Sequence, residues 1–233
     1  MSEDRFKRQS DVAPVEKLLG ATLVGAGHLG SRICEAMAET GFGNHAPLIV
    51  YDFDNVEDHN VPASWFAPDQ IGTSKVEALA ANAKRFSEVE ITTRHQRFSD
   101  QPIMTPIFIM SVDTLEGRKK IWKRISESTS PFPELIIDAR SGWNQIMVFA
   151  FKPSEADRSF LPSFGLDTLE LPCSAKSVAY NAMTVGGLVA AIARDYSLGK
   201  PYPYSITIDH EYWITDFEID YSQFDLGASD DNK

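Results

Sequence analysis

The stretch Ala21-Thr22-Leu23-Val24-Gly25-Ala26-Gly27-His28-Leu29-Gly30 decides the fold class of this chain. Its first four residues form a short apolar run that ends in a glycine, which predicts a buried strand. A G-x-G-x-x-G pattern follows, and residues 29–40 then carry apolar residues at helical spacing. In doubly wound α/β domains such glycines let the backbone approach phosphate, and the helix N-terminus favours its negative charge. The alternative is a glycine turn kept for packing alone.

A carboxylate at the end of the next strand extends the expected nucleotide site. Residues 47–51 predict a second strand, and Asp52 follows it, about 20 residues after Gly30. A carboxylate in this position can accept hydrogen bonds from ribose hydroxyls. Gly25, Gly27, Gly30 and Asp52 are therefore candidate nucleotide-binding residues.

The remainder of the chain alternates strands with helices. Further strands are expected at 89–95, 107–110, 135–138 and 146–151, and further helices at 74–86, 115–126 and 175–197. This alternation predicts a Rossmann-like, doubly wound and mainly parallel sheet. Residues 205–221 alternate apolar with polar side chains, which predicts a β-rich C-terminal extension. We expect an exposed N-terminal arm (1–14), a nucleotide-binding domain (15–204) and a C-terminal strand with an acidic tail (205–233).

Composition narrows the classes of function. The chain has 233 residues and a formal net charge of −11, which argues against a general nucleic-acid or anionic-membrane binder. No apolar run reaches the roughly 18 residues of a membrane span, and the charged N-terminus is unlike a signal peptide. Only two cysteines occur, so neither a disulfide framework nor a structural zinc site is expected. We expect a cytoplasmic protein.

Three further motifs separate this chain from other proteins with the same glycine pattern. They are Asp52-Phe53-Asp54-Asn55-Val56-Glu57-Asp58-His59-Asn60, Ile71-Gly72-Thr73-Ser74-Lys75 and Ser111-Val112-Asp113-Thr114-Leu115-Glu116-Gly117-Arg118. In this order after the glycine pattern, they resemble the motifs of the ThiF/MoeB/HesA family of ubiquitin-like-protein activating enzymes. The resemblance covers about residues 20–200.

The resemblance implies a site for ATP and Mg²⁺ in which a carboxylate is joined to the α-phosphate and pyrophosphate is expelled. Asp54 and Asn60 would contact the nucleotide, Lys75 the phosphates as a point charge, and Asp113 the Mg²⁺ ion. Each residue also has an ordinary structural interpretation. Lys75 fits an exposed helix lysine, Asp113 an N-cap and Arg118 a surface salt bridge.

The chain departs from the family pattern at Ala63, where the resemblance implies an arginine that contacts the phosphates. Removing such a donor typically costs about 10²–10³ in rate. Two other cations are candidates to replace it. Arg140 follows the apolar run 135–138, whose carboxyl end is expected at the same crevice. Arg8, in Arg5-Phe6-Lys7-Arg8-Gln9, is similar to the family's N-terminal arginine that reaches into a partner's site. Each also fits a solvated surface charge.

Several other residues admit two interpretations. Cys173 precedes a predicted helix, whose N-terminus would favour the thiolate and hence a thioester with an activated C-terminus, but an inert loop thiol is preferred. Cys34 is expected in the core. Trp143 and Trp213 fit either packing or a partner contact. The small residues between Gly186 and Ala191 allow close packing on a sheet or on a second subunit.

The sequence thus favours an ATP-dependent adenylyltransferase that activates the C-terminal carboxylate of a ubiquitin-like or small carrier protein, acting as a homodimer. Ala63 makes a catalytically weak binding scaffold a serious alternative. An NAD-dependent oxidoreductase is disfavoured, because Lys75 and Asp113 would then have no evident role.

Overall fold

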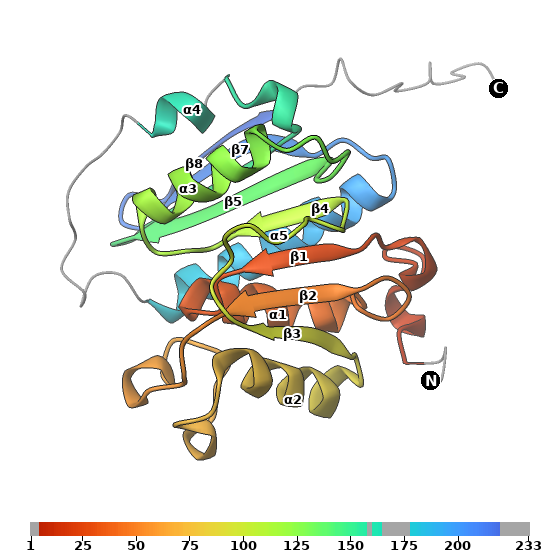
Figure 1. Cartoon of the computed structure of the whole chain (residues 1–233), viewed down its shortest axis with the longest axis vertical. Coiled ribbons are helices and arrows are strands. Elements are labelled where there is room, and N and C mark those ends of the chain that lie inside the picture. Colours follow the sequence, from red (N-terminus) through yellow and green to blue (C-terminus); the bar gives the residue numbers. More distant parts are fainter. Residues whose placement is uncertain (1–4, 158–159, 165–177, 220–233) are drawn as a thin grey trace.

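The computed structural model describes residues 5–157, 160–164 and 178–219. Its described strands form one eight-stranded sheet in the order β3-β2-β1-β4-β5-β6-β7-β8 (Figure 1). The strands are β1 (Ala21–Val24), β2 (Leu48–Asp52), β3 (Ile91–His95), β4 (Ile107–Met110), β5 (Leu135–Gly142), β6 (Gln145–Phe151), β7 (Pro203–Asp209) and β8 (Ile214–Ile219). Strands β1 to β5 pair in parallel, and β5 to β8 pair antiparallel. The expected doubly wound, mainly parallel sheet with a β-rich C-terminal part is confirmed.

Helices cover both faces of the sheet. One face packs against α1 (His28–Thr40), α2 (Lys75–Ser87) and α5 (Ala179–Ser197), and the other against α3 (Leu115–Ser126) and α4 (Phe160–Ser163). Short 3-10 helices lie at Lys7–Gln9, Val15–Lys17, Asp58–Asn60, Pro68–Gln70 and Pro153–Glu155. Among the described helices, none combines the length and the apolar character that crossing a membrane requires.

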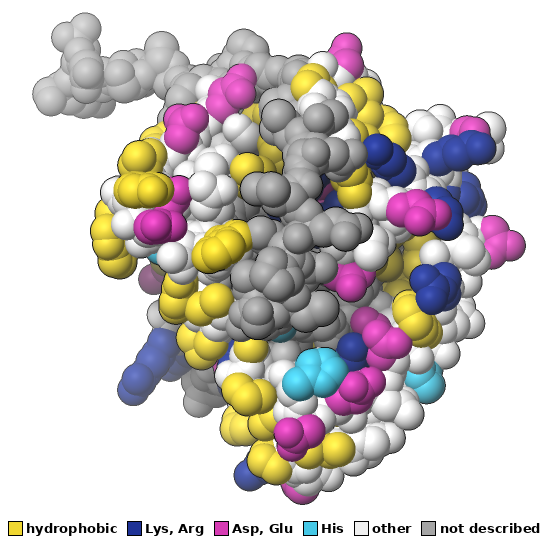
Figure 2. Space-filling model, turned by 90° about the vertical axis from the view of Figure 1, so that its left-hand side faces the viewer, with side chains coloured by type: hydrophobic (Ala, Val, Ile, Leu, Met, Phe, Trp, Pro, Cys, Tyr) yellow, Lys and Arg dark blue, Asp and Glu magenta, His cyan; other side chains and the backbone are white. Residues whose placement is uncertain are grey.

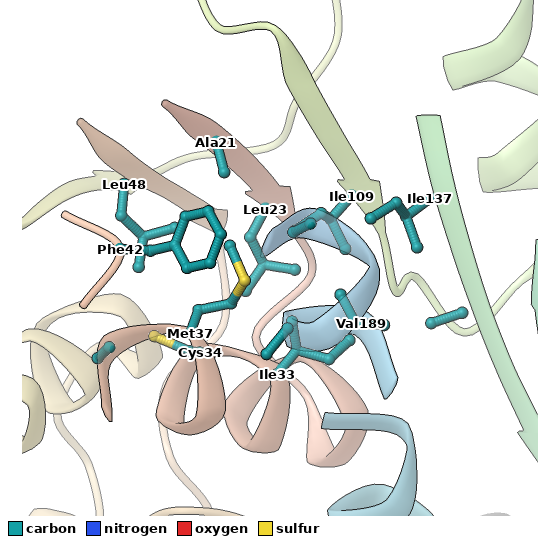
Figure 3. Packing of buried hydrophobic residues seen from close by; sticks show 14 of the residues in the cluster. Ala21, Leu23, Ile33, Cys34, Met37, Phe42, Leu48, Ile109, Ile137 and Val189 are labelled. Carbon is teal, nitrogen blue, oxygen red and sulfur yellow. The ribbon is translucent and has the colours of Figure 1, made fainter. Parts of the chain in front are cut away.

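The larger core lies between the sheet and the α1–α5 layer. Leu23, Ile109 and Ile137 point from three neighbouring strands toward Ile33 on α1 and Val189 on α5 (Figure 3). All five side chains are fully buried, as expected for parallel strands that are covered on both faces.

Helix α5 packs unusually close to α1. A Cβ atom on Gly186 would lie 2.6 Å from the carbonyl oxygen of Arg32, so only glycine fits there. Gly187, the next residue, has nothing within 4 Å of such an atom. Packing within the chain therefore explains the glycine at position 186. Gly187, in contrast, is exposed on the outer face of α5.

Both ends of the described chain belong to the main fold. Phe6 and Ala13 are buried and Phe6 joins the main core, although most other side chains in residues 5–14 are exposed. Strand β7 begins at Pro203 and pairs with β6, so the segment after residue 204 extends the central sheet. Strand β5 also runs on to Gly142, because it forms a hairpin with β6.

The sheet topology identifies the side of the sheet where a ligand is expected to bind. The chain leaves β1 toward α1 on one face and leaves β4 toward α3 on the other, so the crossover direction changes between these two strands. Ligands of open α/β sheets bind beyond the carboxyl ends of the strands at such a point. We call the edge that contains the carboxyl ends of β1, β2 and β4 the carboxyl edge; the arrowheads at the left of Figure 1 mark it.

Candidate nucleotide site

The three glycines after β1 serve different purposes. Gly25 has a φ of +95°, which favours glycine, and a Cβ on Gly30 would lie 1.9 Å from the carbonyl oxygen of Gly25. Both are required by the fold itself. Gly27, at the N-cap of α1, has an extended backbone, and a Cβ added there would meet nothing within 4 Å. No contact among the described residues explains a glycine at 27, whereas close approach of a ligand would.

Asp52 ties the loop after β2 to the glycine turn. Its Oδ2 accepts a hydrogen bond of 2.6 Å from the backbone nitrogen of Ala26, and its Oδ1 accepts one of 2.8 Å from that of Asp54. Each carboxylate oxygen has two lone pairs. Asp52 can therefore hold the loop and also accept hydrogen bonds from a ribose.

Lys75 is held close to this loop. Its Nζ lies 3.1 Å from Oδ2 of Asp54, and its backbone nitrogen donates to the Asp54 carbonyl at 3.0 Å. The interpretation of Lys75 as an exposed helix lysine is wrong, because its side chain is only 11% exposed. Lys75 is the first residue of α2, so its ammonium is fixed near the start of that helix.

Asn60 helps to shape the same loop. Its Oδ1 accepts a hydrogen bond of 2.9 Å from the backbone nitrogen of Glu57 and caps the 3-10 helix there. This leaves the amide NH₂ as the part of Asn60 suited to a phosphate. Ala63 is buried three residues later, two residues before Trp65, whose backbone nitrogen donates to the Ser31 hydroxyl on α1.

Asp113 lies exposed beyond the carboxyl end of β4. It is not the N-cap of α3, because Thr114 takes that position and accepts a hydrogen bond of 3.2 Å from Gly117. No group of three or more potential metal-ligating side chains occurs among the described residues. Mg²⁺ in nucleotide sites usually needs only one or two carboxylates besides phosphate oxygens and water, so Asp113 fits such an ion.

Arg118 is a buried structural residue rather than a surface ion pair. It forms a salt bridge with Asp138 on β5, and it also donates to the carbonyls of Val112 and, at 3.0 Å, Ala139. Burial and the nearby Arg140 lower the pKa of Arg118 to about 9, which is still above neutral, so the guanidinium stays charged. Through its hydrogen bond to the carbonyl of Val112, Arg118 holds the turn that carries Asp113.

Arg140 lies within β5, not in a loop after it. Its Nε and a terminal guanidinium nitrogen lie 2.7 Å from Oδ2 of Asp138. Its Cζ lies 5.0–5.7 Å from the ring centroids of Phe149, Phe160 and Phe164. The guanidinium is therefore held against the α3 face of the sheet, where Phe149 and Phe160 belong to the core.

Sequence reasoning missed Asp138 and His28. Asp138 is fully buried, and its signal was an acidic residue at the end of an otherwise apolar run. His28 is a titratable residue inside the glycine pattern, and its Nε2 lies 3.3 Å from Oγ of Ser141 on β5. Burial lowers the pKa of His28 to about 4, so the imidazole is neutral near neutral pH.

Arg8 is not brought to the site of its own chain. Arg5 forms a salt bridge of 2.5 Å with Glu88 just after α2, and Gln9 donates to the carbonyl of Glu39 near the end of α1. Both helix ends lie opposite the carboxyl edge (Figure 1). Cys173 lies outside the described residues, and Cys34 is buried in the core, where burial raises the pKa of its thiol.

Four exposed aromatic residues and one methionine gather at the carboxyl ends of β5 and β7 and at the start of α5. Trp143 follows β5, Tyr180 and Met183 lie near the start of α5, and Tyr212 and Trp213 form the turn between β7 and β8. The ring of His210 links the group, at 5.2 Å from Tyr180 and 5.9 Å from Trp213. We call these five exposed residues the aromatic surface. Figure 2 looks onto the carboxyl edge and shows hydrophobic side chains along the left of that view.

Fold and site together define an α/β protein of the doubly wound class with a glycine turn of the nucleotide-binding type. The chain belongs to the ThiF family, whose model matches residues 16–202. Among solved structures, PaaA aligns with a TM-score of 0.73 and 16% identity over 94% of this chain and 74% of that chain. Escherichia coli MccB with ATP aligns with a TM-score of 0.69 and 16% identity over 94% of this chain and 72% of that one.

Curated relatives are similar over shorter stretches. Ubiquitin-like modifier-activating enzyme 5 of Drosophila mojavensis is 32% identical over 106 residues, which is 46% of this chain and 23% of that protein. The Drosophila simulans protein of the same name is 39% identical over 74 residues, 31% of this chain and 18% of that protein. The matches thus span less than a quarter of these relatives.

Proposed function

We propose that this chain is an ATP-dependent adenylyltransferase that activates the C-terminal carboxylate of a ubiquitin-like protein or small peptide carrier. The observation that carries the proposal is the arrangement at the carboxyl edge. Gly27 leaves open space at the start of α1, Asp52 borders the same turn, and the buried Lys75 and the exposed Asp113 follow β2 and β4.

The chemistry suits these groups. A carboxylate oxygen of the carrier attacks the α-phosphorus, a new P–O bond forms, and the bond to the oxygen that bridges to the β-phosphate breaks. The electron pair leaves with pyrophosphate. Catalysis of this kind depends on positioning and on neutralising phosphate charge. Asp52 would orient the ribose, and Lys75 and Asn60 would contact the phosphates.

Mg²⁺ would bind at Asp113 together with phosphate oxygens and would neutralise charge on the leaving pyrophosphate. Asp54 positions the Lys75 ammonium through their 3.1 Å salt bridge. Binding of ATP would exchange this contact for a phosphate contact, which is a charge-assisted bond of the same kind.

The relatives support this proposal. One solved MccB structure contains ATP, and another, with a TM-score of 0.70 and 17% identity, contains AMPCPP and MccA. The curated relatives are named for activating a ubiquitin-like modifier. Both point to a nucleotide and a protein or peptide as co-substrates.

We propose that the carrier contacts the aromatic surface. These residues lie at the same edge of the sheet as the glycine turn, so a protein bound there would extend its C-terminus along that edge to reach the α-phosphate. Trp213 is 83% exposed, and an exposed aromatic cluster is typical of a protein contact. We further propose that the protein acts in the cytoplasm, where ATP is supplied, and as a homodimer.

A non-catalytic scaffold is the second candidate, because Ala63 occupies the position where the family pattern has an arginine. ATP–pyrophosphate exchange with candidate peptides separates the two. Exchange that depends on a carrier carboxylate supports the enzyme. Mg-ATP binding without exchange for any carrier supports the scaffold. Tight NAD binding with none for Mg-ATP would overturn both.

A further inference from the structure

The nucleotide turn contains one side chain to which the proposed function assigns no role. His28 is the first residue of α1, directly after Gly27, at the helix end that attracts anions. Its Nε2 contacts the Ser141 hydroxyl at 3.3 Å, and within the described part of the chain no residue hydrogen-bonds its Nδ1. A half-buried imidazole with one engaged nitrogen therefore follows directly after Gly27, where an added Cβ would meet nothing within 4 Å.

We propose that His28 is a nucleotide-contacting residue whose Nδ1–H donates to a phosphate oxygen, and that its imidazole takes up a proton from solvent as Mg-ATP binds. The inference rests on the proposed function. It gives the site a cation where Ala63 supplies none. The partner at Ser141 accommodates both protonation states, since a hydroxyl accepts from the imidazolium and donates to the neutral ring.

The surroundings of His28 favour protonation of its imidazole only when an anion binds beside it. On α1, Arg32 lies one turn later and is paired with Glu35 at 2.7 Å. On α5, residues 179–193 contain no charged side chain.

On the sheet side, Ser141 faces His28, while Asp138 and Arg140 bind one another toward the α3 face. Asp52 at the end of β2 is engaged by the turn itself. Burial keeps the imidazole neutral in the free protein, where its pKa is about 4. A triphosphate beside it would raise this pKa, because a nearby opposite charge favours the charged form.

The test is an NMR titration of the histidine ring signals of the whole protein, with and without saturating Mg-ATP. The His28 signal among the five histidines is assigned by its loss in His28→Gln. In the free protein it should not titrate between about pH 5.5 and 8.5, and in the complex it should titrate within that window. A His28 signal that stays neutral throughout in the complex would overturn the proposal.

Calorimetry provides a second measurement. His28→Gln should bind Mg-ATP about 10- to 100-fold more weakly, the range of a lost hydrogen bond to a charged group. It should also abolish the proton uptake that accompanies Mg-ATP binding to the wild-type protein. The matched control is His45→Gln, at an exposed histidine in the loop between α1 and β2, which should leave affinity and uptake unchanged.

The two proposals fail in different ways. If wild-type protein binds Mg-ATP and His28→Gln binds it equally well, the role of His28 is wrong and the proposed function stands. If wild-type protein binds no Mg-ATP at all, the proposed function itself fails.

Discussion

Arg140 and Asp138 lie two residues apart on β5, and the Nε and a terminal guanidinium nitrogen of Arg140 each lie 2.7 Å from the same carboxylate oxygen. The other carboxylate oxygen binds Arg118. One fully buried carboxylate thus holds two guanidinium groups, beside the turn that carries Asp113. The three side chains together carry one more positive than negative charge.

Asp138→Ala should destabilise the protein strongly, because it leaves the buried Arg118 without its counter-charge. Breaking a buried pair by removing one partner costs about 3–5 kcal/mol. Urea unfolding measures the loss. Asp216→Ala, at an exposed carboxylate on β8, is the matched control and should change the free energy of unfolding little. A loss of under about 1 kcal/mol for Asp138→Ala would show that the cluster is not structural.

Local patterns predicted most of the fold. The apolar run before Gly25 and the glycine pattern indicated β1 and α1, and the expected third helix coincides with α3. Apolar runs, glycine patterns and helical spacing are local features, which a single sequence displays directly.

Contacts between distant residues were not predictable in the same way. Ser141 and His28 are 113 residues apart, and Arg118 and Asp138 are 20 apart. Their partners depend on strand order and on which face of the sheet each side chain takes. Arg118 therefore fitted a surface charge in sequence and is buried in the structure. The extent of β5 was missed for the same reason, since Ser141 and Gly142 are strand residues only because β6 pairs with them.

Gly27→Ala should weaken Mg-ATP binding without harming the fold. The backbone at position 27 is extended, and an added Cβ meets nothing within 4 Å, so thermal stability should hold. A methyl group in the path of the phosphates should cost about 5- to 100-fold in affinity, the effect of 1–3 kcal/mol of overpacking. Calorimetry and thermal melting measure the two effects. The control is Gly187→Ala, also in open space but on α5. Equal affinity in both variants would mean that the nucleotide does not approach Gly27.

Lys75→Ala and Asp113→Ala should each reduce pyrophosphate exchange by about 10²-fold or more, the usual effect of losing a group that stabilises developing charge. Stability should change little, because Asp113 is exposed and Asp54, the partner of Lys75, is 47% exposed and can be solvated. Lys120→Ala, at an exposed α3 lysine paired with Glu116, is the control. Exchange at the wild-type rate in either variant would reject that residue's role.

A dimer that shares its sites should show complementation. Arg8 lies at the edge opposite its own glycine turn, so it can act only in the site of a second copy. Arg8→Ala and Lys75→Ala should each be weak alone. A mixture of the two variants should recover activity, because some dimers then hold one intact site with Lys75 from one subunit and Arg8 from the other. Light scattering checks the assembly, and a monomer at micromolar concentration would contradict both the dimer and this role of Arg8.

Arg140 is a second candidate, beside His28, for the charge that Ala63 does not supply. Loss of Arg140 and loss of Asp138 should affect stability differently. Arg140→Ala leaves Asp138 paired with Arg118, so it should cost less stability than Asp138→Ala. It also removes the excess positive charge of the cluster, so exchange should fall by about 10²–10³-fold, with Arg140→Lys intermediate because an ammonium lacks the two-pronged fork.

The variants are compared by exchange assays at temperatures where urea unfolding shows each to be folded. Ala63→Arg in the Arg140→Ala background should recover part of the rate if the two positions serve the same phosphates. Ala63 is buried, so a guanidinium added at this position must extend outward to reach the phosphates. Ala63→Arg alone measures the cost of that placement. Full activity of Arg140→Ala would reject the compensation and restrict Arg140 to holding Asp138. The missing charge would then have to come from His28 within the turn or from Arg8 of a second copy.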